Sequence, residues 1–157
     1  VMKKYRIAES ICIVILIVFI GILSAEETAS DKAVKEVAGA VISDVDIKGL
    51  SKQNEMQIKK ELSISAKDYD GIYFVKSDEV MDVRELLIIK LKDNQSSDDA
   101  KEKIEKRIKD KQTLFEGYAP EQSAMLKNYV LKQKAGFIFY CVLEDNEAAV
   151  SAFNKTL

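Results

Sequence analysis

The stretch Ser96–Tyr118 reads SSDDAKEKIEKRIKDKQTLFEGY, and its spacing predicts an amphipathic helix around which the fold is arranged. Six residues recur every three or four positions and so share one stripe of the helix: Ala100, Ile104, Ile108, Lys111, Phe115 and Tyr118. Lys111 is the one charged residue on this stripe. The other charges crowd the opposite side, which is typical of a solvated face. The serines at the start are suited to capping, and Gly117 with Pro120 ends the helix.

The apolar stripe of this helix needs partners, and the flanking sequence offers strands. Val83–Lys92 carries apolar residues on both alternating faces, so its middle is expected to be covered on both sides. Tyr129–Gln133 and Phe137–Leu143, joined by a turn at Lys134-Ala135-Gly136, read as a hairpin. Ile72–Val75, rich in aromatic and β-branched residues, is a further strand.

Shorter helices complete the predicted order α-α-β-β-α-β-β-α. Ser30 or Asp31 is expected to cap the first, and a weaker helix follows at Asn54–Leu62. Residues 120–127 form a loop or a short helical segment, and Asp145 or Asn146 caps the last helix. The prediction is an α+β two-layer domain with a mainly antiparallel four-stranded sheet, helices mostly on one face, and a preceding transmembrane or signal helix.

The N-terminus predicts export across a membrane. Lys3, Lys4 and Arg6 precede the apolar run Ile11–Leu23, which is the pattern of a signal anchor or signal peptide. We therefore divide the chain into this segment at 1–25, a linker at 26–30 and an extracytoplasmic domain at 31–157. By the positive-inside rule, residues 7–25 would cross the cell membrane once with the C-terminal domain outside. The alternatives are secretion after signal cleavage and, less favoured, an ordinary core helix.

Composition excludes several functions. The chain has no histidine, which removes histidine-dependent triads and histidine zinc sites. The charged fraction of 32% is mixed in sign, with a net charge of −2, and no basic stripe points to nucleic acid. Cys12 and Cys141 both lie in apolar surroundings, so neither a disulfide nor a reactive thiol is expected. We predict no metal, no cofactor and no catalytic residues.

Several motifs give the chain a family resemblance. They are Glu85-Leu86-Leu87-Ile88-Ile89-Lys90, Arg107, Phe115-Glu116-Gly117-Tyr118 with Pro120-Glu121-Gln122, and Gly136-Phe137. From about Met56 to Phe153 the chain resembles an uncharacterised family of small bacterial extracytoplasmic proteins, catalogued as a domain of unknown function. The resemblance implies a lipoprotein signal or membrane anchor, but Cys12 opens the apolar run and does not look like a lipid-attachment cysteine. It implies no activity.

Two groups of residues are candidate binding sites. Glu85, Lys90 and Arg107 could meet between the helix and the sheet, where a charged cluster in a cleft is a legitimate site; surface ion pairing is the plainer account. The second group is Tyr118, Pro120, Glu121 and Gln122, which could line a groove beside the sheet. In the plainer account, Tyr118 finishes the stripe of the helix and Pro120 stops the helix.

These features predict a membrane-tethered extracytoplasmic domain that binds a protein or cell-envelope ligand. The alternative is a carboxylate-dependent cell-envelope hydrolase that uses Glu85 and Glu121. The sequence holds no catalytic signature in favour of the hydrolase.

Overall fold

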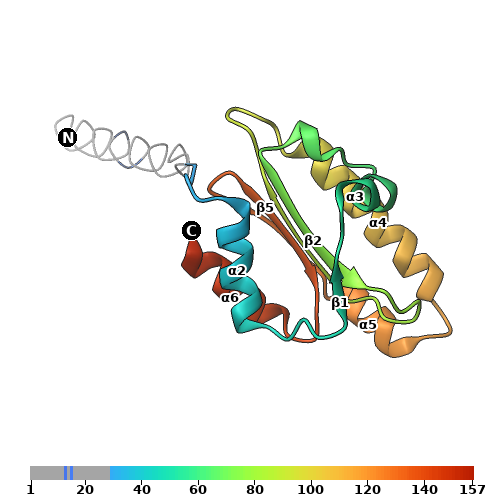
Figure 1. Ribbon diagram of the computed structural model, residues 1–157. Helices are drawn as coiled ribbons and strands as arrows, with labels where there is room; N and C mark the ends of the chain where they lie inside the picture. Colours follow the sequence, from blue (N-terminus) through green and yellow to red (C-terminus); the bar gives the residue numbers. More distant parts are fainter. Residues whose placement is uncertain (1–12, 14, 16–28) are drawn as a thin grey trace, which may run out of the picture.

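The computed structural model describes Ile13, Ile15 and residues 29–157, and an antiparallel five-stranded sheet runs through their centre (Figure 1). The order across the sheet is β1-β2-β3-β5-β4, and each neighbouring pair is antiparallel. The strands are β1 (Leu50–Lys52), β2 (Gly71–Ser77), β3 (Glu85–Lys90), β4 (Val130–Lys134) and β5 (Phe137–Val142).

The predicted α+β class and antiparallel pairing are confirmed, but the prediction of four strands was wrong. The extra strand, β1, pairs Ser51 with Lys76 at the edge of the sheet. With three residues it is too short for an alternating apolar pattern to reveal it.

The helices lie on both faces of the sheet, so the domain has three layers (Figure 1). The prediction of two layers, with the helices mostly on one face, was wrong. One face is covered by α2 (Val34–Asp44) and α6 (Asn146–Thr156), and the other by α3 (Glu55–Leu62), α4 (Asp98–Phe115) and α5 (Pro120–Lys127). A short 3₁₀ helix, Ala66–Asp68, follows α3. Residues 120–127 are therefore a helix, one of the two forms that the sequence allowed.

The two central strands explain why both faces are covered. All six residues of β5 are buried, and Ile88 on β3 lies opposite Phe139 on β5. Alternate residues of such a strand point to opposite faces, so an all-apolar strand needs a layer on each side. Fully burying one large apolar side chain stabilises a fold by about 1.5–3 kcal/mol.

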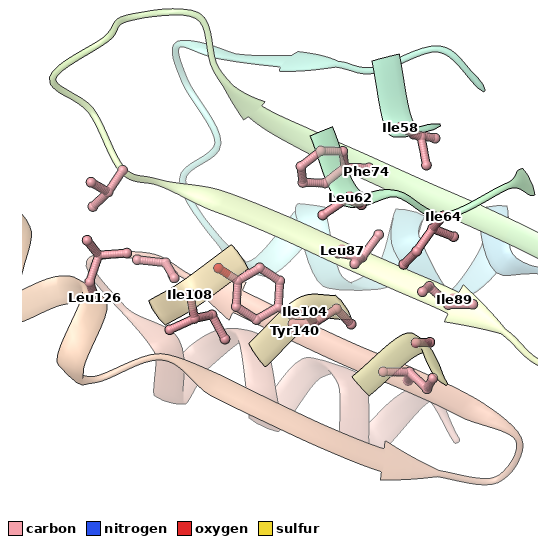
Figure 2. Packing of buried hydrophobic residues seen from close by; sticks show 14 of the residues in the cluster. Ile58, Leu62, Ile64, Phe74, Leu87, Ile89, Ile104, Ile108, Leu126 and Tyr140 are labelled. Atoms are coloured by element: carbon pink, nitrogen blue, oxygen red, sulfur yellow. The ribbon is translucent and has the colours of Figure 1, made fainter. Parts of the chain in front are cut away.

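Each layer contributes its own core. On the α4 side, Ile104 and Ile108 of α4 pack with Leu87 and Tyr140 of the sheet, as Figure 2 shows. On the other side, the rings of Phe139 and Phe153 stack with centroids 4.6 Å apart. The predicted stripe of the long helix is confirmed at Ala100, Ile104, Ile108 and Phe115, which are buried.

Side-chain caps fix several helix ends. Asn54 and Gln57 form a reciprocal capping box on α3, and Asp145 accepts a hydrogen bond from the backbone N–H of Ala148 at the start of α6. The predicted cap at Ser30 or Asp31 was wrong: α2 begins at Val34 after Ala33, which makes no side-chain cap.

Apart from Ile13 and Ile15, the predicted membrane segment at 1–25 lies outside the described residues, as does most of the linker at 26–30. Ile13 and Ile15 are helical, with 51% and 62% of their surface exposed. Among the described residues, no helix is both long and apolar enough to cross a bilayer.

Candidate functional site

The predicted meeting of Glu85 and Arg107 occurs at the boundary between the sheet and α4. Glu85 is the first residue of β3 and is fully buried. Arg107 donates from Nε to Glu85 Oε1 at 3.0 Å and from Nη2 to Oε2 at 2.8 Å. This two-point contact between a guanidinium and a carboxylate is the strongest form of protein ion pair.

Two further side chains complete the shell of the Glu85 carboxylate. Lys111, one turn beyond Arg107 on α4, places Nζ 2.7 Å from Oε2. Tyr140, on the neighbouring β5, donates its hydroxyl to Oε1 at 2.6 Å. Lys111 therefore occupies the apolar stripe of α4 because it faces a buried carboxylate.

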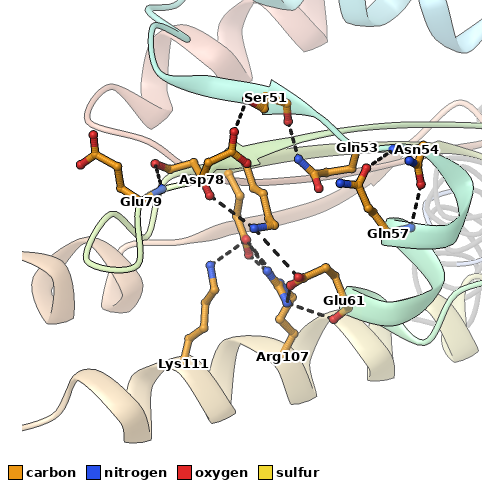
Figure 3. A network of polar contacts seen from close by, with 12 residues as sticks. Ser51, Gln53, Asn54, Gln57, Glu61, Asp78, Glu79, Arg107 and Lys111 are labelled. Carbon is orange, nitrogen blue, oxygen red and sulfur yellow. Dashed lines mark hydrogen bonds and ion pairs between the residues drawn. The ribbon is translucent and has the colours of Figure 1, made fainter.

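A second, outer layer surrounds this cluster (Figure 3). Glu61 of α3 accepts from Arg107 Nη1 through its side chain and its backbone carbonyl, both at 3.0 Å. Lys76 of β2 lies 3.9 Å from the other oxygen of Glu61. Arg107 thus ties together two helices and the sheet. Among the described residues, every buried side-chain N or O atom has a hydrogen-bond partner.

The electrostatics keep the Glu85 carboxylate ionised. Burial alone would raise its pKa, but the charge of Lys111 and the hydrogen bonds from Arg107 outweigh burial and lower the pKa below its usual value. Burial lowers the pKa of Lys111, and Glu85 opposes that shift. Burial and the adjacent Glu85 charge raise the pKa of Tyr140 well above its ordinary range. The geometry is that of a closed, satisfied ion cluster, which favours a structural role.

Four other predicted residues do not join this cluster. Lys90 lies at the opposite end of β3, where its Nζ is 3.1 Å from Asp70 Oδ2. Tyr118 is 56% exposed and stacks on Phe115, and Glu121 is exposed in the first turn of α5. Gln122 accepts a hydrogen bond from the backbone N–H of Val83, so it holds the start of β3 against α5.

The open cavities lie elsewhere on the domain. One groove of about 590 Å³ runs between the edge strand β4 and helix α6, lined by Val130, Lys132, Val150, Ser151 and Lys155 among others. A hollow of about 520 Å³ shares Val130, Asn146 and Glu147 with it and continues toward α5. A larger cavity of about 1120 Å³ lies at the end of the sheet near residue 29, and Lys90 with Asp70 lines part of its wall.

No group of cysteine, aspartate or glutamate side chains in the described part of the chain is arranged to hold a metal ion. Asp98 and Asp99 lie in the first turn of α4, where acidic side chains suit the positive end of the helix dipole.

Sequence reasoning missed Lys111, Tyr140 and Glu61. A signal existed for Lys111, since a lysine on an apolar stripe requires a buried partner. Tyr140 looked like one more apolar strand residue. Glu61 gave no signal, because its contact depends on how α3 packs beside α4.

Comparison with known proteins gives one match. Residues 43–143 match the model of a family described as Domain of unknown function (DUF4358). The chain belongs to the DUF4358 family. The matched span runs from the end of α2 to the residue after β5, so Glu85, Arg107, Lys111 and Tyr140 all lie within the DUF4358 domain. No curated protein and no solved structure matches the chain.

Proposed function

We propose that this chain is a membrane-tethered extracytoplasmic domain that binds a protein or cell-envelope ligand. The observation that carries the proposal is the order of residues at the N-terminus, where Lys3, Lys4 and Arg6 precede the apolar run Ile11–Leu23. This order favours a segment that holds the basic end in the cytoplasm and passes the rest outward. A tether raises the effective concentration of the domain near ligands at the membrane surface.

One structural feature supports a binding role. The domain carries open cavities on its surface, including the groove between β4 and α6. The charged cluster at Glu85 is enclosed, and its side chains already pair with one another, so we look for the binding surface elsewhere. Binding through Lys90, Tyr118, Glu121 and Gln122 stays a prediction; Lys90 lines the cavity at the end of the sheet.

The hydrolase alternative is weaker on physical grounds. A general acid needs a carboxyl whose pKa is raised toward neutrality and which reaches the substrate. Glu85 has a lowered pKa and no exposed surface. We therefore do not assign Glu85 to catalysis.

The orientation is tested by labelling living bacterial cells with a membrane-impermeant maleimide. Glu116 is exposed on the connection between α4 and α5, so Glu116→Cys offers a reactive thiol. The background carries Cys12→Ser, and Cys141 is buried and stays unreactive. We expect Glu116→Cys to be labelled on intact cells and the background protein to remain unlabelled.

Labelling of Glu116→Cys only after lysis would refute the extracytoplasmic placement. Carbonate extraction of the same cells separates the two exported forms, because an uncleaved anchor stays in the membrane pellet and a cleaved protein leaves it. If cross-linking of the intact tethered protein captures nothing that a cross-linked control membrane protein does not, the binding role fails.

A further inference from the structure

Within residues 29–157, β4 is the last strand of the sheet, and its outer edge lies beside the groove that α6 forms with it. We propose that this edge binds an acidic, extended peptide segment, which pairs with β4 as a sixth strand and places alternate side chains in the groove. The inference deepens the proposed binding role and rests on it, but it does not depend on membrane tethering.

The backbone of β4 has groups available for such pairing. The turn at Ala135-Gly136 has φ of +48° and +81°, the signature of a two-residue hairpin turn, which makes Lys134 and Phe137 the hydrogen-bonded closing pair. Hydrogen-bonded and outward-pointing positions alternate along an antiparallel strand. Leu131 and Gln133 therefore direct their N–H and C=O groups away from β5.

These outward groups are not used within the domain. β4 is the last strand in the order, and within residues 29–157 no backbone hydrogen bond from outside the sheet reaches Leu131 or Gln133. Unpaired strand edges are the surfaces to which extended peptides add, and main-chain hydrogen bonds supply the affinity.

The groove supplies pockets for alternate side chains of the peptide. Val130 and Lys132 of β4 face α6, where Val150 and Ser151 form the opposite wall. The adjoining hollow at Asn146 and Glu147 extends the groove past the start of β4. The groove is mainly apolar, so it favours apolar peptide side chains on this face.

The lysine side chains beside the groove favour an acidic partner. Lys132 and Lys155 are exposed beside the groove, and Lys101 of α4 reaches the opposite face of the strand, where its Nζ lies 2.7 Å from Gln133 Oε1. A segment added to β4 would meet lysine on both of its faces. Acidic side chains are complementary to the part of this edge between Lys132 and Lys155. Glu147 at the other end of the groove, and Glu144 and Asp145 in the adjoining hollow, disfavour acidic side chains there.

The same charges disfavour a second copy of the chain. Antiparallel pairing of two β4 edges would bring Lys132 and Lys134 of each copy close to those of the other, and like charges across a sheet are destabilising. Lysine on an edge strand is a common protection against such self-pairing.

The test uses the purified full chain in detergent, so that it is independent of orientation in cells. A displayed library of random twelve-residue peptides is selected against it, and the recovered peptides are expected to be rich in Asp, Glu and β-branched residues. Hydrogen exchange then reports the binding mode: a saturating selected peptide should slow exchange of the Leu131 and Gln133 amides about tenfold or more.

Paired variants separate backbone pairing from side-chain effects. Gln133→Pro removes an outward N–H, whereas Gln133→Ala removes the same side-chain bonds to Ser97 and Lys101 and keeps the N–H. We expect Gln133→Pro to weaken peptide binding about tenfold or more relative to Gln133→Ala. The circular dichroism spectra of both variants show whether the fold is kept. Should Gln133→Pro fail to fold, the hydrogen-exchange result on the natural chain still decides.

A charge-matched pair tests the acidic preference. Lys132→Glu with Lys155→Glu should abolish binding of the selected peptides, and Lys60→Glu with Lys109→Glu, on exposed positions away from the groove, should not. A failed selection, binding that survives Gln133→Pro, or peptides without acidic enrichment would overturn the proposal. Dimers by sedimentation that Gln133→Pro dissociates would also overturn it, in favour of self-pairing. None of these results bears on the maleimide labelling of cells.

Discussion

Replacing Glu85 by glutamine should be among the most damaging single changes that the domain can receive. Glutamine keeps the shape of the side chain and can accept from Tyr140, but it removes the negative charge between Arg107 and Lys111. Those cations are 12% and 20% exposed, so they would be left close together with little water. Breaking a buried ion pair from one side costs about 3–5 kcal/mol. Because Glu61 still contacts Arg107, we expect about 3 kcal/mol.

Urea unfolding of the full chain in a nonionic detergent, followed by circular dichroism, measures this cost. At a typical slope of about 2 kcal/mol per molar urea, the midpoint should fall by about 1.5 M. Glu102→Gln, on the exposed face of α4, is the matched control and should change the unfolding free energy by less than about 0.5 kcal/mol. Adding Lys111→Met to Glu85→Gln should recover part of the loss, since one uncompensated charge is removed.

The same variant gives a pH signature with a defined sign. The folded-state pKa of Glu85 is below its ordinary value of 4.5, so its stabilisation is fully present above that value and is lost as the pH falls through the folded-state pKa. The stabilities of the natural chain and Glu85→Gln should therefore differ most near neutral pH and converge in acid. A Glu85→Gln loss below about 1 kcal/mol, or a difference that does not shrink in acid, would refute the argument that this carboxylate balances buried positive charge.

Three further changes test other contacts. Tyr140→Phe removes the hydroxyl that donates to Glu85 and should lower the unfolding free energy by about 2 kcal/mol in the same urea assay; no change would mean that this hydrogen bond is not a net contributor. Gly71→Ala would place its Cβ 2.6 Å from Val34 Cγ1, so a loss of about 2 kcal/mol is expected. Val34→Ala should relieve most of this clash, since only the Val34 Cβ contact at 3.1 Å stays; a simple sum of the two single losses would contradict this. Gly39→Ala meets nothing within 4 Å inside α2 and should raise the thermal midpoint through a gain of about 1 kcal/mol; a lower midpoint would contradict it.

The sequence by itself determined the elements that carry a strong periodic or capping signal. The long helix, the hairpin of β4 and β5, and the double-faced burial of β3 followed from apolar spacing, because a regular element with that spacing has only one way to remove its apolar groups from water. The sequence also predicted correctly that Glu85 and Arg107 meet, because both lie on elements that had to pack against each other.

Only the tertiary structure decided the features that depend on how separate elements dock. The short strand β1 exists because β2 offers it an edge, and its own three residues hold no pattern. The all-apolar β5 already implied helices on both faces of the sheet, but the sequence prediction placed them mostly on one. The contacts that build the Glu85 cluster join residues far apart in the sequence. Glu85 is 26 residues from Lys111 and 55 from Tyr140, and Arg107 is 46 residues from Glu61. Contacts at such separations are set by packing geometry, which local spacing along a chain does not encode.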